Sequence, residues 1–201
     1  HEDGSYRWLL CRGVAARGAA QRAELIAGSI ENITEQANAL ERSRSAVWCD
    51  PLTGLANRAV FLETIGRRLT HFRERNAGRF AVLFLDLDRF KVINDSLGHL
   101  VGDELLMAVS RRLESCVRSS DVLAGLGGDE FAILLNSLSD EMQANVLAHR
   151  IQDAMTAPFS IGGREVFTSI SIGIACRPIE HPNAVEILGD ADTAMEQPKA
   201  R

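Results

Sequence analysis

The sequence predicts an α/β fold in which helices pack on a central β-sheet. From Asp50 onward, segments with helical spacing of apolar residues alternate with short apolar runs. The run Phe80–Leu85 is apolar at every position, as in a strand that is covered on both faces. Gly127 and Gly128 separate two further apolar runs, which is typical of a β-hairpin. Alternation of this kind favours helices layered on a sheet.

The expected elements follow in the order helix, strand, helix, two strands, helix, strand and helix. The second helix is interrupted at Gly98, and the last strand is entered through a turn at Gly162 and Gly163. The expected ranges are 57–75, 80–85, 90–94 continued over 102–117, 122–126, 131–135, 140–155, 165–175 and 184–195.

The composition excludes several classes of protein. The chain has 201 residues, of which 46% are hydrophobic, and this excludes a disordered chain. A net charge of −5 argues against a nucleic-acid partner, which needs a basic face. The longest clean apolar run, Phe80–Leu85, is too short to cross a bilayer, so we expect no membrane segment in this chain.

The cysteines and the first residues indicate the setting of the chain. Four scattered cysteines without a Cys-x-x-Cys pair argue against zinc and favour free thiols in a reducing cytoplasm. The chain opens without Met and without a signal segment, which indicates a fragment of a larger protein. We therefore expect a cytoplasmic location for this chain, and the parent protein could still be attached to a membrane.

The first 48 residues differ in pattern from the rest. Residues 1–31 are predicted to form β-strands, with runs at Ser5–Cys11 and Ala23–Ile26, as at the end of a domain whose start is missing. Residues 32–48 are predicted to be helical, with Ile33, Ala37, Leu40, Arg44 and Val47 in heptad spacing. This seam could align two chains, or it could belong to an ordinary amphipathic linker helix; both readings stay open.

Two carboxylates follow the buried strand, in the segment Asp86-Leu87-Asp88. Alternation places Asp86 and Asp88 on one side of the strand and Leu87 on the other. Hard oxygen ligands at a strand end suit Mg²⁺. The alternative is a solvated turn in which Asp88 caps the next helix.

The segment Gly127-Gly128-Asp129-Glu130-Phe131 is the second candidate site. Two glycines at a hairpin tip leave the backbone bare, so that a phosphorylated ligand can approach closely. A plain type I′ turn explains the glycines but not the two acids that follow. If the two strands are neighbours, Asp86 and Asp129 could share a divalent metal for nucleotidyl transfer, with Lys91 reaching phosphate oxygens.

These residues resemble the signature of the GGDEF family of diguanylate cyclases, and further motifs agree in order and spacing. The resemblance runs from about Val47 to the end of the chain. The matching segments are Asp50–Arg58, Phe84–Asp95, Gly98-His99, Gly102-Asp103, Gly127–Phe131 and Asp190–Met195. It implies a palm-like nucleotidyl-cyclase fold with a central mixed β-sheet.

The resemblance implies that two GTP molecules condense into cyclic di-GMP and release pyrophosphate. Each domain would bind one GTP, so a homodimer would bring two sites face to face. Mg²⁺, or Mn²⁺ in its place, would be held by Asp86, the Leu87 carbonyl and Asp129. Asp129 and Glu130 would be the catalytic acids of the signature, with Glu130 supporting metal and substrate.

The family pattern also implies which residues bind the substrate. Asn94 and Asp103 would read the guanine edge. The remaining matching positions would lie near the phosphates; they are Phe90, Lys91, Gly127, Gly128 and Lys199. Arg118 and Asp121 stand at the spacing of the family's inhibitory R-x-x-D site, where the product cyclic di-GMP binds; a surface ion pair is the alternative.

The chain departs from the family pattern at several positions. Gly125 stands where many members carry Arg, and Glu196 stands where Tyr is usual. Pro198 should end the last helix, and the chain stops before the family's final strand. Contacts to the γ-phosphate could therefore be incomplete.

The N-terminal segments resemble the closing strands of a PAS/PAC sensor domain. The expected organisation is a sensor remnant over residues 1–35, a signalling linker helix over 36–48 and a C-terminally truncated GGDEF domain over 49–201. The leading hypothesis is a product-inhibited diguanylate cyclase. The alternative is a catalytically weak module that binds GTP or cyclic di-GMP and controls an attached domain, such as an EAL phosphodiesterase.

Overall fold

The computed structural model describes residues 6–17, 23–35, 48–75, 79–176 and 183–196. The chain divides into two compact units, His1–Val47 and Trp48–Arg201. No helix in the described ranges is long and apolar enough to cross a membrane.

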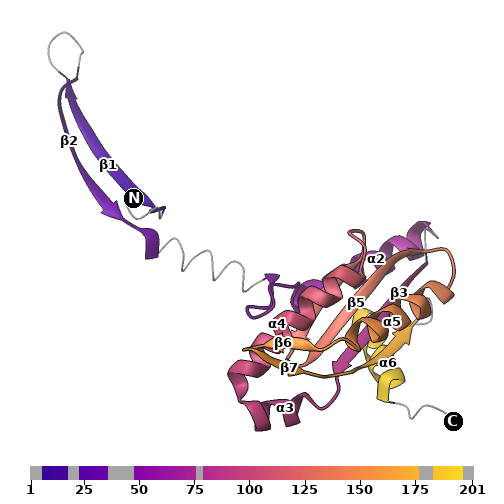
Figure 1. Cartoon of the computed structure of the whole chain (residues 1–201). Helices are drawn as coiled ribbons and strands as arrows, with labels where there is room; N and C mark the ends of the chain where they lie inside the picture. The colour runs from indigo at the N-terminus through magenta and orange to yellow at the C-terminus, as the bar shows by residue number, and fades with distance from the viewer. Residues whose placement is uncertain (1–5, 18–22, 36–47, 76–78, 177–182, 197–201) are drawn as a thin grey trace. The chain divides into compact units, whose positions relative to one another are not determined.

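The first unit contains an antiparallel hairpin of β1 (Leu9–Arg17) and β2 (Ala23–Asn32), drawn in indigo in Figure 1. The predicted β-structure is therefore confirmed, but its bounds were wrong. The second strand runs on to Asn32 instead of ending at Ile26, because its pairing with the first strand continues to Leu9. Helical residues begin only at Thr34, and the heptad positions from Ala37 to Val47 lie outside the described residues.

The second unit is built on a four-stranded sheet in the order β4-β5-β3-β8. Its strands are β3 (Arg79–Leu87), β4 (Val122–Gly127), β5 (Glu130–Leu138) and β8 (Ile170–Ala175). The three strand pairings are antiparallel, and an isolated parallel bridge between Ala56 and Ala124 makes the sheet mixed at its β4 edge. The predicted α/β fold with a mixed central sheet is confirmed.

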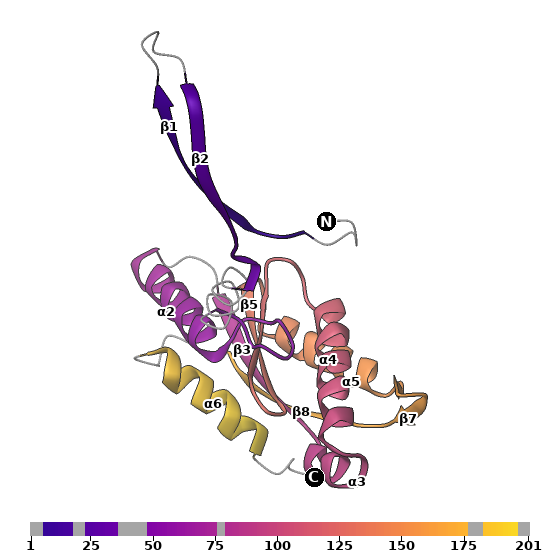
Figure 2. The same ribbon diagram turned by 90° about the vertical axis from the view of Figure 1, so that its left-hand side faces the viewer.

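Helices cover both faces of this sheet. On one face lie α2 (Arg58–Arg75) and α6 (Ala184–Glu196), and on the other lie α4 (His99–Cys116) and α5 (Met142–Met155), as Figure 2 shows. Alternate residues of β3 face the two layers: Phe80, Val82 and Phe84 pack toward α2 and α6, whereas Leu83 and Leu85 pack toward α4 and α5. The strand is buried on both faces, as its apolar run predicts.

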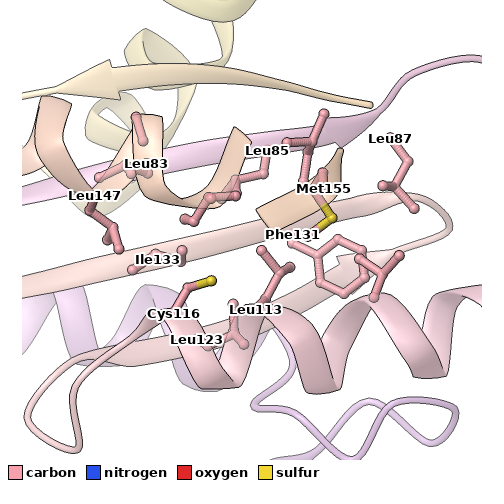
Figure 3. Close-up of a cluster of buried hydrophobic side chains, with 14 of the residues drawn as sticks. Leu83, Leu85, Leu87, Leu113, Cys116, Leu123, Phe131, Ile133, Leu147 and Met155 are labelled. Atoms are coloured by element: carbon pink, nitrogen blue, oxygen red, sulfur yellow. The ribbon is translucent and has the colours of Figure 1, made fainter. Parts of the chain in front are cut away.

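The core on the α4–α5 side places the end of β3 rigidly. Figure 3 shows Leu83 and Leu85 of β3 beside Phe131 and Ile133 of β5, above Leu113 of α4. All five side chains are at most 1% exposed. Because close-packed apolar side chains resist displacement, the polar residues that follow this core are held in fixed positions.

Helix α3 (Phe90–Leu97) and helix α4 are joined at Gly98, which has a φ of 90°. The predicted break is confirmed, but α4 begins at His99 rather than at Gly102. Gly102 lies inside α4 and is buried. Gly102 therefore does not mark the start of α4, although it lies in the first turn of that helix.

The predicted strand over residues 165–175 was wrong, because two elements occupy that range. A small hairpin of β6 (Phe159–Ile161) and β7 (Arg164–Val166) precedes β8, and it turns at Gly162 and Gly163 with φ of 56° and 77°. The chain then continues through residues 167–169, where the Ser169 carbonyl accepts a hydrogen bond of 3.0 Å from the Asp88 amide. This bond extends the pairing of β8 with β3 beyond Leu87.

Gly173 of β8 allows α6 to approach the sheet closely. A Cβ at this position would overlap the Ala191 carbonyl oxygen and lie 2.5 Å from the Met195 amide nitrogen. Any larger residue would therefore push α6 away from the sheet.

We predict that Gly173→Ala lowers the free energy of unfolding by about 1–3 kcal/mol, because the added carbon meets helix backbone that cannot rotate away. Urea unfolding followed by circular dichroism measures the change. Gly189→Ala on α6 is the matched control: its Cβ meets open space, so it should be neutral or stabilising by up to about 1 kcal/mol. Equal stability of Gly173→Ala and the parent chain would contradict the close contact.

Candidate nucleotide and metal site

The register between β3 and β5 brings the two acidic motifs together. Asp86 lies opposite Glu130 in the antiparallel pair, and the Leu87 amide donates a 3.2 Å hydrogen bond to the Asp129 carbonyl oxygen. The expectation that these strands are neighbours is confirmed. The end of the buried strand and the tip of the hairpin therefore form one acidic edge.

The hairpin tip has the backbone that its glycines permit. Gly127 pairs with Glu130, and Gly127 and Gly128 have φ of 115° and 61°. A Cβ at either glycine would meet no atom within 4 Å. The glycines are thus needed for their positive φ, and they leave open space above the turn.

Burial and the neighbouring acidic side chains together raise the pKa of Asp86. The pKa of Asp86 is raised to about 6, first by burial and then, in decreasing order, by the nearby charges of Asp129, Glu130, Asp88 and Asp192. Such mutual repulsion is relieved by a cation placed among the carboxylates.

Glu130 is perturbed in the same direction as Asp86. Its pKa is raised, first by burial, then by Asp192 and to a smaller extent by Asp129, while Arg58 acts in the opposite direction. Sequence reasoning did not assign Arg58 or Asp192 to the site, although both stand in motifs that resemble the family. Arg58 begins α2 and Asp192 lies in α6, and the packing of these two helices on one face of the sheet brings their charges near Glu130.

The donor set of this edge fits Mg²⁺ or Mn²⁺, because it offers only carboxylate and carbonyl oxygens. Within the described ranges, no three acidic, His or Cys side chains converge closely enough to hold an ion by themselves. Mg²⁺ commonly uses one or two carboxylates and takes its other ligands from phosphates and water. The arrangement suits a metal that binds together with a nucleotide.

Asp88 is hydrogen-bonded to the start of β8, and the alternative in which it caps the next helix was wrong. Helix α3 is preceded by Arg89, which has a φ of 60°, and no side chain caps the helix. The Asp88 carboxylate instead accepts hydrogen bonds from the hydroxyls of Ser169 and Ser171, the latter at 2.7 Å. These bonds tie the end of β3 to β8.

A cavity of about 360 Å³ lies beside the acidic edge. Five of the residues predicted to bind substrate line it, together with Glu130; the five are Phe90, Asn94, Asp103, Gly127 and Gly128. The Asn94 Oδ1 atom is buried and has no hydrogen-bond partner. An unpaired buried acceptor is costly, so this atom favours a ligand with an N–H donor.

Part of the cavity lining comes from the loop before α2, namely Asp50, Leu52 and Thr53, which the sequence analysis had named only as part of a motif. Asp50 accepts a 2.8 Å hydrogen bond from the Thr53 amide and a 2.5 Å bond from its hydroxyl. Gly125 donates a 3.0 Å bond to the Ala56 carbonyl, and a Cβ on Gly125 would lie 3.3 Å from Thr53 Oγ1. Gly125, which stands where many family members carry Arg, therefore lets the loop before α2 pack against β4.

The other predicted site residues lie apart from this cavity or outside the described residues. Lys91 is exposed in the first turn of α3, and Lys199 lies beyond the described part of the chain. The Asp121 carboxylate accepts 3.2 Å hydrogen bonds from the amides of Arg118 and Asn136. Arg118 and Asp121 also line two cavities together, of about 240 and 370 Å³, and Arg150 joins them in the smaller one.

Comparison with known families decides the class of the chain. The family profile described as "Diguanylate cyclase, GGDEF domain" matches residues 47–201. The chain belongs to the GGDEF-domain family. The chain therefore belongs to the nucleotidyl-cyclase kind of domain, and its fold and paired acidic motifs agree with this.

Several relatives are named for opposite activities toward cyclic di-GMP. The chain is 44% identical over 147 residues to the diguanylate cyclase TpbB of Pseudomonas aeruginosa. It is 43% identical over 151 residues to the cyclic di-GMP phosphodiesterase NbdA of the same organism. These matches cover 73% and 75% of this chain but only 34% of TpbB and 19% of NbdA.

Solved structures agree with the fold. The GGDEF domain of TpbB from Pseudomonas aeruginosa is similar with a TM-score of 0.69 and 44% identity, over 73% of this chain and 86% of that one. A sensory box/GGDEF family protein from Caulobacter crescentus is similar with a TM-score of 0.69 and 34% identity, over 73% of this chain and 94% of that one.

We predict that the charge on Asp86 destabilises the metal-free fold. Its pKa is raised from 3.8 to about 6, so the protonated form stabilises the fold below about pH 4, and that contribution is lost as pH rises through 6. Asp86→Asn should therefore melt at a higher temperature than the parent chain at pH 8 in a chelator, and the difference should shrink toward pH 4. Thermal unfolding at stepped pH measures it.

Glu74→Gln, which removes an exposed acid near the far end of α2, is the control and should give no such pH-dependent difference. A parent chain that is more stable than Asp86→Asn at pH 8 would contradict the repulsion among the strand-end acids.

Proposed function

We propose that this chain is a diguanylate cyclase that condenses two GTP molecules into cyclic di-GMP and pyrophosphate. The observation that carries the proposal is the pairing of Asp86 with Glu130 beside a cavity that holds the unpartnered Asn94 oxygen. An acidic edge next to a base-sized cavity is what metal-assisted nucleotidyl transfer requires.

In this proposal the cavity holds the guanine base and the acidic edge holds the phosphates. Asn94 and Asp103 accept hydrogen bonds from the base. Asp86, the Leu87 carbonyl and Asp129 hold Mg²⁺ or Mn²⁺, which when bound stabilises charge on the triphosphate and lowers the pKa of the attacking hydroxyl. Glu130 supports the same metal and substrate.

The remaining contacts concern the phosphate chain. Phe90 offers its backbone amide at the start of α3, Lys91 brings a positive charge, and Lys199 would reach the outer phosphates. The open backbone of Gly127 and Gly128 leaves room for the triphosphate. A ribose hydroxyl of each GTP attacks the α-phosphorus of the other and loses its proton to solvent. Each new P–O bond forms as the bond from that α-phosphorus to its β-phosphate oxygen breaks, so that closing the ring releases two pyrophosphates.

The reaction needs two bound nucleotides, and each chain offers one base cavity of this composition within its described residues. We therefore propose that two copies of the chain meet with their acidic edges facing. The N-terminal hairpin would be the end of a sensor domain, and the segment that joins it to Trp48 would carry the signal that sets this dimer. Both statements rest on the resemblance and on the heptad spacing of the linker.

We predict that Asp129→Ala abolishes formation of cyclic di-GMP from GTP and Mg²⁺, because it removes a metal ligand from the exposed turn, while the thermal melting temperature stays within a few degrees. Chromatography of the reaction measures the product. Glu74→Ala is the control, since about 24 Å of helix separates Glu74 from Arg58 at 1.5 Å per residue. Turnover by Asp129→Ala at the rate of the parent chain would contradict the proposed cyclase activity.

We further propose that cyclic di-GMP binds at Arg118 and Asp121 and inhibits the enzyme. The two residues line shared cavities, and the Arg118 guanidinium suits a guanine or a phosphate. Arg118→Ala should weaken binding of cyclic di-GMP by tenfold or more, as measured by isothermal titration calorimetry. Arg111→Ala, which removes a neighbouring exposed arginine of α4, should bind as the parent does, and an Arg118→Ala chain with unchanged affinity would refute this site.

A second candidate function has its own support. The relatives NbdA of Pseudomonas aeruginosa and PdeR of Escherichia coli, 43% and 42% identical, are named as cyclic di-GMP phosphodiesterases, and this chain spans 19% and 24% of their lengths. In such a setting the domain would bind GTP or cyclic di-GMP and regulate an attached phosphodiesterase. GTP binding without product formation, in a chain extended beyond Arg201, would favour this function over the cyclase.

A further inference from the structure

Gly102 lies in α4 where the side chain of Asn94 occupies the space that a Cβ would fill. A Cβ built on Gly102 overlaps Asn94 Oδ1 and lies 3.0 Å from Asn94 Cγ and 3.2 Å from Phe90 Cζ. The Asn94 carboxamide is therefore packed directly against the backbone of α4. A side chain of any size at position 102 would displace it.

The glycines within helices differ in the space around the position that a Cβ would occupy. Gly66 of α2 and Gly189 of α6 meet no atom within 4 Å of an added Cβ. Gly102 is the one helical glycine in the described part of the chain whose missing side chain makes room for a neighbour. A glycine inside a helix lowers helix stability relative to alanine, so its presence here has to be explained by that neighbour.

The neighbour is a polar atom with an unmet hydrogen bond. Asn94 Oδ1 is buried without a partner, and it shares the lining of the 360 Å³ cavity with Asp103, the residue that follows Gly102. Burying an acceptor without a donor is unfavourable unless a ligand supplies the donor. Gly102 thus permits an arrangement in which the buried oxygen of Asn94 is available to an N–H donor of a bound ligand.

We propose that Gly102 is a specificity-determining positioning residue, which holds the Asn94 carboxamide oxygen beside Asp103 so that the cavity selects a base edge with two adjacent N–H donors. This inference rests on the proposed nucleotide function. Guanine presents such an edge through its N1–H and its 2-amino group. Hypoxanthine lacks the 2-amino group, and adenine presents an acceptor at N1, so both leave an acceptor of the cavity unpaired.

The test measures binding rather than turnover, so that it does not depend on catalysis. Guanosine and inosine triphosphates with an α,β-methylene bridge cannot release pyrophosphate, and their affinities in the presence of Mg²⁺ are compared by isothermal titration calorimetry. The parent chain should prefer the guanosine analogue. Gly102→Ala should reduce that preference by about tenfold, mainly through weaker binding of the guanosine analogue.

Two further variants separate positioning from loss of structure. Gly66→Ala, a helical glycine in open space, should keep the parent's preference. Asn94→Ala should lose the preference as Gly102→Ala does, and the double variant should show no further loss, because the displaced carboxamide is then absent. If Gly102→Ala fails to fold, the inference requires that adding Asn94→Ala restores folding, and failure to restore it overturns the inference.

Other outcomes also decide the question. Parent-like discrimination by Gly102→Ala, or an additional loss in the double variant, overturns the positioning role. A parent chain that discriminates between the analogues but makes no cyclic di-GMP refutes the proposed activity while the role of Gly102 stands. A parent chain that binds neither analogue refutes both.

Discussion

The antiparallel register of β3 against β5 is the constraint on which the rest of this domain depends. It sets Asp86 opposite Glu130 and joins the Leu87 amide to the Asp129 carbonyl. Because side chains alternate along a strand, a slip by one residue would turn Asp86 into the core and Leu87 toward the site. The side chains before this point differ between the two faces, with Phe80, Val82 and Phe84 on one and Leu83 and Leu85 on the other, and their close packing opposes such a slip.

The same core explains how the domain tolerates an unfavourable cluster of charge. Asp86 and Glu130 both have raised pKa values, caused by burial and by neighbouring acids. The Asp88 carboxylate at this edge accepts hydrogen bonds from the hydroxyls of Ser169 and Ser171. The packing behind the site thus supports an arrangement that is unfavourable without a cation and that a metal–nucleotide complex would relieve.

Sequence reasoning reached most of the fold because its signals were local. The double-sided apolar run of β3 and the glycine pair of the hairpin each predicted an element that the structure contains. It failed at β6 and β7, whose three residues each are too few for a periodic pattern, and it started α4 too late because it took Gly102 for a helix boundary. Both failures concern positions where long-range packing decides the outcome.

Some features of the candidate site were also predictable from the sequence, and others were visible only in the structure. The residues of the signature and of the strand end were found from their order in the sequence, and the structure places Asn94, Asp103 and the two hairpin glycines around one cavity. The sequence could not reveal that Asp88 bonds to β8, that Asp192 and Arg58 act on Glu130, or that Gly102 accommodates Asn94. Each of these depends on contacts between segments that are distant along the chain or on opposite sides of a break, and no local pattern encodes them.

A crystal structure of the chain with Mg²⁺ and guanosine α,β-methylene triphosphate would test the central claim most directly, namely that the cavity and the acidic edge form one nucleotide site. The account predicts the base between Asn94 and Asp103, with the metal between the triphosphate and Asp86 and Asp129. A nucleotide base bound instead in the larger cavity of about 830 Å³, which is lined by Asp86, Asp88, Phe167 and Thr168, with no ligand at Asn94, would contradict it.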